Sequence, residues 1–271
     1  MSGGITKLVA IGAQDAHLVG NPEVSFFKSM YKRHTNFTQL VERQVIQGNP
    51  SPNSMSTVRF ERKGDMLNYV YFTDDSETGK VNWERYIESV ELLIGGQVID
   101  KQDFKFSDTL AVDLLAQSVS KSYMGGHYTG HGDASYFYPL RFFFCENVQS
   151  SLPLVALQYH DVEIRINWAA NFPHSARVEC HANFILLDTM ERQSIANSKA
   201  QILITQVQKA SGDNNKIQEL NFNHPIKLLA SSNVSDHALT SANSKVKLQI
   251  NGVDVSDFKR ARPNYTTVST Y

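Results

Sequence analysis

Cysteine is scarce in this sequence, since Cys145 and Cys180 are the only two among 271 residues. A secreted scaffold held together by disulfides carries more cysteines in a shorter chain, so we expect two small buried thiols and a reducing, cytosol-like compartment for folding. Long apolar runs are missing as well: no stretch approaches the roughly 20 uninterrupted apolar residues of a membrane-spanning helix. The N-terminal residues also lack the basic and apolar regions of a secretory signal.

An excess of charge of either sign is missing too. The 26 Lys and Arg residues nearly balance the 27 Asp and Glu residues, which leaves a formal net charge of −1. Proteins that bind the nucleic-acid backbone carry a basic patch, so no direct contact with nucleic acid is predicted. The 41% of hydrophobic residues and 20% of charged residues are ordinary for a folded protein.

The sequence has none of the common signatures of catalysis. In the opening stretch 3–20, Gly12 and Gly20 are too far apart for a phosphate-binding loop, and Lys7 precedes both. There is no GxSxG nucleophile elbow and no HxH pair of a metal-binding jelly roll. We therefore predict neither an enzyme nor a bound cofactor.

Three weaker chemical candidates remain. The loop GGHYTGHGD contains His127, His131 and Asp133, which are metal-binding residue types, but their spacing matches no established site, so a polar surface loop is favoured. His160 is expected to be packed on the more apolar face of its strand. The carboxylates in the turn at 74–77 are expected to be solvated.

Strand patterns dominate what is present. Residues 90–100 predict a hairpin around Gly95-Gly96, and residues 57–74 predict two strands joined as a hairpin by Lys63-Gly64-Asp65. In 158–168, polar and apolar residues alternate as in a sheet packed on one face. Further predicted strands are 39–47, 140–145, 176–188, 217–222, 225–230, 244–255 and 264–270.

Two stretches differ from this pattern. Residues 107–124 begin with N-cap residues, end before Gly125-Gly126 and predict a helix. Residues 189–216 are mostly polar and predict a connection between two bodies. Many short strands with one or two helices in connections indicate an all-β sandwich with elaborated loops.

Several segments, in order along the whole chain, resemble the major capsid proteins of nucleocytoplasmic large DNA viruses of the algal-virus type. The opening GGITKLVAIGAQDAHLVGNPEVSFFKSMYKRHTNF (3–37) is the most specific. PLRFFFCENVQSSLPLVALQYHDVEIRI (139–166) and FILLDTMERQSIA (184–196) are similar to the family's first domain, and NFNHPIKLL (221–229) and LQINGVDV (248–255) to its second.

The resemblance implies a double jelly roll, in which two antiparallel β-sandwiches lie side by side with minor helices in the loops. It implies an N-terminal arm at 1–25, a first jelly roll at 26–210 and the start of a second, incomplete one at 211–271. Half a sandwich would leave strand edges unpaired. We therefore expect the sequence to stop short of the natural end.

The resemblance also implies a structural function. Three chains would form a homotrimeric, pseudo-hexagonal capsomer that tiles an icosahedral virus shell, assembled in the host cytoplasm. Expected partners are neighbouring capsomers and minor capsid proteins, with only indirect contact to an inner viral membrane. Two other possibilities stay open: a carbohydrate-binding jelly roll using Tyr128, Tyr136 and Tyr138, and a metal-dependent jelly-roll enzyme using His127 and His131.

Residues for subunit contacts are expected in the arm and the segment after it, where apolar and aromatic side chains can anchor in pockets of the same or a neighbouring subunit. They are Ile5, Leu8, Val9, Ile11, Phe26, Phe27, Tyr31, Arg33, His34 and Phe37. Three sequons, at Asn36, Asn233 and Asn264, are possible glycosylation sites.

Overall fold

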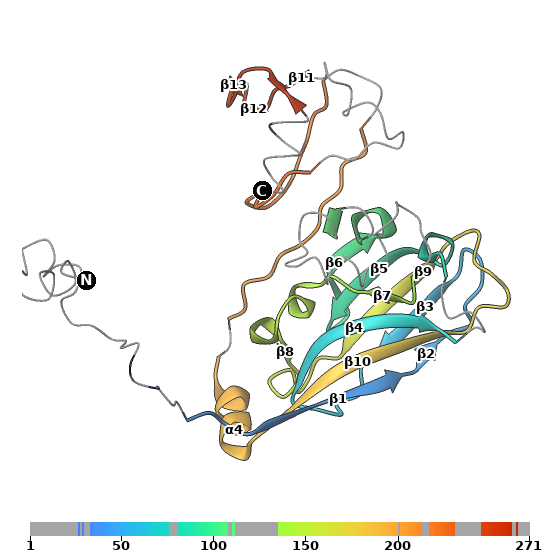
Figure 1. Cartoon of the computed structure of the whole chain (residues 1–271), viewed down its shortest axis with the longest axis vertical. Helices are drawn as coiled ribbons and strands as arrows, with labels where there is room; N and C mark the ends of the chain where they lie inside the picture. The colour runs from blue at the N-terminus through green and yellow to red at the C-terminus, as the bar shows by residue number, and fades with distance from the viewer. Residues whose placement is uncertain are drawn as a thin grey trace, which may run out of the picture. The chain divides into compact units, whose positions relative to one another are not determined.

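The computed structural model of the chain divides it into two units, Met1–Thr35 and Asn36–Tyr271, and all labelled elements lie in the second (Figure 1). The structure describes residues 27, 29, 33–75, 81–107, 110–111, 135–199, 201–212, 217–230, 245–261 and 264.

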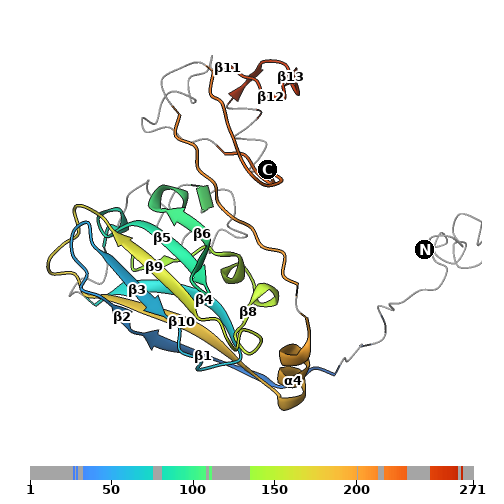
Figure 2. The same cartoon turned by 180° about the vertical axis from the view of Figure 1, so that it is seen from behind.

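Two antiparallel sheets form a sandwich, seen from both sides in Figures 1 and 2. Sheet A has the order β1 (Phe37–Gln44), β10 (Val178–Leu187), β4 (Met66–Asp74) and β7 (Phe137–Pro139), with β8 (Leu152–Pro153) also paired to β4. Sheet B has the order β2 (Ile46–Gln47), β3 (Met55–Arg59), β9 (Val162–Trp168), β5 (Ile87–Ile94) and β6 (Gln97–Asp103).

The strand pairs are nested. The first long strand pairs with the last, β1 with β10, and inside this pair come β3 with β9, β4 with β7 and, innermost, β5 with β6. Successive pairs alternate between sheet A and sheet B. A long hairpin of strands rolled into two sheets in this way is a jelly roll, which confirms the predicted all-β sandwich.

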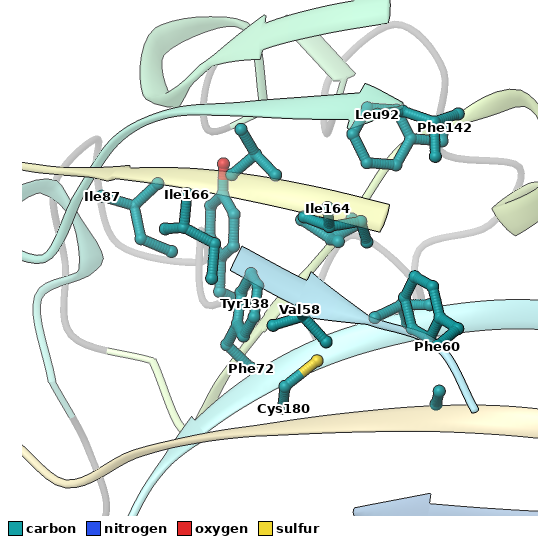
Figure 3. Packing of buried hydrophobic residues seen from close by; sticks show 14 of the residues in the cluster. Val58, Phe60, Phe72, Ile87, Leu92, Tyr138, Phe142, Ile164, Ile166 and Cys180 are labelled. Atoms are coloured by element: carbon teal, nitrogen blue, oxygen red, sulfur yellow. The ribbon is translucent and has the colours of Figure 1, made fainter. Parts of the chain in front are cut away.

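The core lies between the sheets, where side chains from both layers point into one space (Figure 3). The predicted alternation in β9 is confirmed, because Val162, Ile164, Ile166 and Trp168 are buried and the residues between them are more exposed. The Trp168 indole donates a hydrogen bond of 2.8 Å to the Ser56 hydroxyl, so its one polar atom is satisfied inside the core.

The hairpin around Gly95-Gly96 is confirmed between β5 and β6. Both glycines have positive φ, 60° and 79°, as a two-residue type I′ turn requires. A Cβ at Gly95 would also lie 2.7 Å from His160 Nδ1, so that position has no room for a side chain.

The predicted hairpin at Lys63-Gly64-Asp65 is wrong. Both strands exist, but β3 belongs to sheet B and β4 to sheet A, so the connection crosses between layers. Gly64 is needed for close packing, since a Cβ there would lie 2.8 Å from the Cβ of Phe184. Local turn residues cannot distinguish a hairpin from a crossing, because the partner of each strand comes from far along the chain.

Two predicted strands differ from the structure. Residues 39–47 break at the exposed Val45, where the chain leaves β1 for β2 in the other sheet. The segment 140–145 is no strand: it follows β7 and ends in the 3-10 turn η3 (Phe143–Cys145). Its run of three phenylalanines is buried in the core, and such an unbroken apolar run does not specify strand periodicity.

The polar connection contains an unpredicted helix, α4 (Thr189–Asn197). The Asp188 side chain accepts a hydrogen bond from Thr189 N, and Glu191 follows three residues after Asp188, which is the sequence signature of a helix start. The helix predicted at 107–124 lies almost entirely outside the described residues.

Beyond α4, regular structure is sparse in the described residues. The strands predicted at 217–222 and 225–230 are absent there. Within 244–255, β12 (Gln249–Ile250) and β13 (Val253–Asp254) form a small hairpin around Asn251-Gly252. A second short ladder joins β11 (Lys245–Val246) to β14 (Lys259–Arg260). The segment 264–270 is outside the described residues except for Asn264.

The core position of Phe72 generates a stability prediction. Phe72→Ala removes a fully buried ring that stacks on Tyr138, and we expect the free energy of unfolding to fall by about 3–5 kcal/mol. Urea denaturation followed by tryptophan fluorescence measures the loss. The matched variant Tyr159→Ala, at a 92% exposed ring, is expected to change little, and equal losses in both variants would contradict the packing described.

Candidate assembly surfaces

The buried carboxylate of Asp65 anchors the segment by which the chain leaves the sandwich after β10. Asp65 Oδ2 accepts hydrogen bonds from Leu187 N at 2.8 Å and from Arg192 Nη2 at 2.9 Å, and Arg192 Nε lies 2.7 Å from Oδ1. The hydrogen bond to Asp65 and the charge of that carboxylate raise the pKa of Arg192. The end of β10 and the start of α4 are thereby tied to the β3–β4 connection.

Residues 206–209, which we call the strap, lie along the free edge of β6. Gln206 Nε2 donates to Ile99 O at 2.5 Å, Val207 N donates to Asp100 Oδ1 at 2.8 Å, and Lys209 forms an ion pair with Asp103. Unpaired sheet edges are sites of unwanted strand addition, and the strap covers this one.

Asp100 is the centre of the strap contact. Its carboxylate is buried, and it also accepts hydrogen bonds from Gln102 Nε2 at 2.7 Å and from Lys101 N at 2.9 Å. Desolvation raises the pKa of Asp100, although the hydrogen bonds oppose this. The charge is therefore tolerated only because three donors surround it.

The outer face of sheet B is polar and internally paired. Glu91 lies 2.9 Å from Lys101 and 3.2 Å from Arg165, and Arg59 lies 2.6 Å from Asp161 at the end of the neighbouring strand pair. Desolvation alone would raise the pKa of Glu91, but Lys101 and Arg165 outweigh it and leave this pKa below its ordinary value.

The outer face of sheet A is aromatic. Tyr69 and Tyr71 alternate with core residues of β4 and therefore point away from the core. Tyr71 stacks on His181 at 5.2 Å and meets Phe137 edge-on at 5.9 Å, and Tyr69 lies 6.3 Å from Tyr71. We call Tyr69, Tyr71, Phe137 and His181 the aromatic row.

Polar contacts border the aromatic row. His181 Nε2 lies 3.1 Å from Thr73 Oγ1, and Arg43 forms an ion pair of 3.0 Å with Glu179. The sequence analysis did not identify this surface, although tyrosines two residues apart in a strand are the pattern that could have done so.

Few of the residues expected to make subunit contacts are described. Phe27, Arg33, His34 and Phe37 are exposed, and His34 Nδ1 lies 3.0 Å from Thr35 O. The others lie outside the described residues: Ile5, Leu8, Val9, Ile11, Phe26 and Tyr31.

Of the three sequons, two are described. Asn36 and Asn264 are exposed, and Asn264 Nδ2 donates to Arg260 O at 2.9 Å. Asn233 lies outside the described residues, so the three remain possible glycosylation sites.

Three chemical expectations are corrected. His160 lies exposed in the loop before β9, since that strand begins only at Val162. Asp74 is buried rather than solvated, and accepts hydrogen bonds from the Tyr86 hydroxyl at 2.7 Å and from Arg177 N at 2.8 Å. Tyr138, expected as an exposed sugar-stacking ring, is buried in the core.

Other chemical candidates lie outside the residues that the structure describes. His127, Tyr128, His131 and Asp133 are outside the described residues, as is Glu77. In the part of the chain that is described, no three His, Cys, Asp or Glu side chains gather as a metal site would need. The helices of that same part include none with the length and apolar character to cross a membrane.

Both cysteines are free thiols. Cys180 is buried and Cys145 partly buried, and burial raises the pKa of both, that of Cys145 to about 12. The thiols therefore stay protonated and pack as small apolar side chains, as the sequence predicted.

The family is decided by sequence comparison. The profile of the family described as "Major capsid protein N-terminus" matches residues 25–185, more than half of the chain. The chain belongs to this major capsid protein family. The resemblance found in the sequence motifs is thereby confirmed.

Relatives of this capsid protein occur in several large DNA viruses. It is 33% identical to the major capsid protein of Pyramimonas orientalis virus, over 98% of this chain and 74% of that one. It is 32% identical to the major capsid protein of Paramecium bursaria Chlorella virus 1, over 85% of this chain and 60% of the relative. A match to capsid protein 1 of Acanthamoeba polyphaga mimivirus spans 48% of the relative's length at 33% identity.

Solved structures agree on the fold. A quasi-atomic model of the PBCV-1 virus capsid matches with a TM-score of 0.68 at 24% identity, over 91% of this chain and 76% of that one. PBCV-1 VP54 matches with a TM-score of 0.56 at 28% identity, over 68% of this chain and 50% of VP54. The capsid protein thus has the all-β fold of the double jelly-roll capsid proteins, and its role is structural, in the shell of the virion.

The Glu91 cluster generates a prediction about pH. Because the folded state lowers the pKa of Glu91, its stabilising contribution is complete above the unfolded value of 4.5 and is lost as the pH falls through the lower folded value. The difference in melting temperature between wild type and Glu91→Gln should therefore be largest near neutral pH and shrink below about pH 4.5. Lys101→Met removes one partner and should reduce the same pH dependence; a constant difference at all pH values would contradict this account.

The strap generates a prediction about local exchange. Asp100→Ala removes the acceptor of the Val207 amide, and because hydrogen bonds to charged groups contribute about 1.5–3 kcal/mol, exchange of that amide should become at least about tenfold faster. Hydrogen-exchange NMR measures it, with β9 amides as the internal reference. Asp103→Ala removes the ion pair with Lys209 and the acceptor of the Phe106 amide, neither of which involves Val207, and should leave Val207 nearly unchanged. Unaltered exchange in Asp100→Ala would show that the strap is held elsewhere.

Proposed function

We propose that this capsid protein builds a virus shell by self-association, with three copies forming a homotrimeric capsomer of pseudo-hexagonal outline and capsomers tiling an icosahedral lattice. The observation that carries the proposal is the nested strand order of the sandwich, in a chain whose relatives are major capsid proteins. Two jelly rolls per chain and three chains per capsomer give six similar bodies around one axis, which accounts for a hexagonal outline.

The domain organisation belongs to the same proposal: an arm at 1–25, a first jelly roll at 26–210 and the start of a second at 211–271. Its support is the change in character after the strap. Beyond the strap, the described strands are short, from β11 to β14. Several large apolar side chains in this part of the chain are exposed, including Ile226, Leu228, Val253 and Phe258. Such surface is expected where more protein packs against it.

The arm is proposed to mediate contacts between subunits, through Ile5, Leu8, Val9, Ile11 and the segment from Phe26 to Phe37. Exposed Phe27 and Phe37 support it as candidate anchors. Neighbouring capsomers and minor capsid proteins are the proposed partners, with assembly in the host cytoplasm. The balanced charge supports the absence of direct nucleic-acid contact, and contact with an inner membrane would be indirect.

We assign the capsid protein no catalytic role. Among the described residues, the buried carboxylates of Asp65, Asp74 and Asp100 accept structural hydrogen bonds from backbone amides. The carbohydrate-binding alternative is not favoured, since the burial of Tyr138 removes one of its three rings and leaves Tyr136 as the one described exposed ring.

Sedimentation velocity and electron microscopy of the purified full chain test the proposal together. We expect a species of three copies with a hexagonal outline in projection. Monomers at every concentration would overturn self-assembly by this chain.

Deletion of residues 1–25 tests the arm. We expect the variant to melt at the wild-type temperature, because the core of the sandwich draws on later residues, but to form capsomers or shells less completely. Circular dichroism follows folding, and particle counts by electron microscopy follow assembly. Particles in normal number from the deletion variant would remove the arm from the proposal.

A further inference from the structure

We propose that the edge of β1 receives residues 5–11 from the N-terminal arm of a second copy of this chain as an added strand. The inference rests on the proposed function, in which the arm makes contacts between subunits, and deepens it by naming the surface that the arm meets. It starts from the edges of the two sheets.

Three of the four sheet edges are protected. β2 is two residues long, and β7 is three residues long and ends in Pro139, which has no N–H to offer a partner strand. The strap covers β6 through the hydrogen bond from Val207 N to Asp100. Natural sheets use short strands, prolines and covering segments of these kinds to prevent pairing with other chains.

The fourth edge, β1, is eight residues long, and its first part has none of these protections. Residues 37–41, which we call the open edge, have the sequence FTQLV, without a charge, a proline or a glycine. They lie at the margin of the sandwich in both views (Figures 1 and 2). Within the part of the chain that the structure describes, their hydrogen-bond partners all lie in β10 and include Asn183, whose Nδ2 donates to Gln39 Oε1 at 3.3 Å.

The other end of β1 is covered. Glu42 forms an ion pair of 3.3 Å with Lys63, and Gln44 Oε1 accepts a hydrogen bond of 3.4 Å from Glu61 N. The connection between β3 and β4 therefore borders this end of the strand. Strand addition is thereby confined to the open edge.

The open edge selects the kind of segment that pairs with it. A sheet edge offers backbone N–H and C=O groups to an extended segment, and the alternating side chains determine which sequence fits. Phe37 and Val41 lie on the same side of β1 and are 59% and 45% exposed. A strand with little charge and many β-branched residues packs best beside such side chains.

The arm contains a segment of this kind. Residues 5–11 (ITKLVAI) are rich in β-branched side chains, and Lys7 is their one charge. Gly4 and Gly12 border the segment, and glycine weakens a strand, so the added strand would end there. At about 3.3 Å per residue, the segment covers roughly 23 Å and can pair with the whole open edge.

The added strand comes from a second copy, because exchange of arms links the subunits. Each chain carries one arm and one open edge, so three chains that each give an arm to the next close a ring. The stretch 12–36 between the arm segment and β1 spans up to about 80 Å when extended, which is enough to reach a neighbouring subunit. Since an arm rather than a sandwich face makes the contact, six bodies can still alternate around the capsomer axis.

Hydrogen-exchange mass spectrometry of the full chain tests the inference, with the peptide covering 37–44 as the probe. In associated wild type, the amides of the open edge that face away from β10 should exchange at least about tenfold more slowly than in the dilute monomer, since each gains a backbone hydrogen bond. Leu8→Pro prevents the arm segment from pairing, and Val41→Lys places a charge on the open edge. Either variant alone should lose the slow exchange.

A mixture of the two variants shows whether the arm acts between copies. Leu8→Pro chains keep the open edge and Val41→Lys chains keep the arm, and their 37–44 peptides differ in mass. With Val41→Lys chains in excess, the Leu8→Pro peptide should regain slow exchange. The controls are Gln14→Pro in the arm and Val45→Lys at a 69% exposed valine, and both should exchange like wild type.

The outcomes separate the inference from the proposed function. A wild-type chain that stays monomeric at every concentration overturns both. Association with unchanged exchange at the open edge overturns the inference alone. Slow exchange that persists in Leu8→Pro overturns the arm segment as the added strand. Slow exchange already present in the dilute monomer, or no recovery in the mixture, overturns the exchange between copies.

Melting temperatures equal to that of wild type show that the variants are folded. Residue 8 contributes nothing to the core cluster of the sandwich, so Leu8→Pro is expected to fold. Thr38→Lys, at another exposed position of the open edge, takes the place of Val41→Lys if that variant is unfolded. Leu8→Val keeps the backbone N–H and should retain the slow exchange, and its loss in this variant would contradict pairing through the backbone.

Discussion

The pairing of β1 with β10 encloses every other strand pair of the sandwich. It runs in register from Phe37 opposite Leu187 to Gln44 opposite Cys180, so segments far apart in the chain must meet before the roll is closed. Closing so long a loop costs entropy that local contacts do not offset. The compensating free energy comes from the side chains that both sheets bury between them (Figure 3).

Three buried aspartates stabilise connections between segments of the jelly roll that are far apart in the sequence. Asp65, Asp74 and Asp100 each accept a backbone N–H from a segment more than 100 residues later, those of Leu187, Arg177 and Val207. A carboxylate removed from water is tolerated only with such donors, and in return it fixes where a distant segment lies. The exit helix, the end of β4 and the strap are therefore placed by charge-assisted hydrogen bonds rather than by apolar packing alone.

The two outer faces of the sandwich have different chemistry, and this difference suits a protein that assembles with copies of itself. Sheet A carries stacked rings with a border of polar contacts, and sheet B carries a recessed Glu91 beneath more exposed cations. A capsid protein must pack against other subunits without disturbing its own core. A jelly roll meets this need because the side chains on the outer faces of its two sheets point away from the core.

Strand alternation and turn chemistry are local properties, so the sequence by itself determined the all-β class, the buried face of β9 and the glycine turn between β5 and β6. The sequence motifs also indicated the capsid protein family. Only the tertiary structure decided that β3 and β4 lie in different sheets, that Asp74 is buried and that Tyr69 and Tyr71 form an aromatic row with Phe137 and His181. The physical reason is that partners in a nested roll are set by long-range pairing, and a side chain's surroundings depend on strands that lie far from it in the chain.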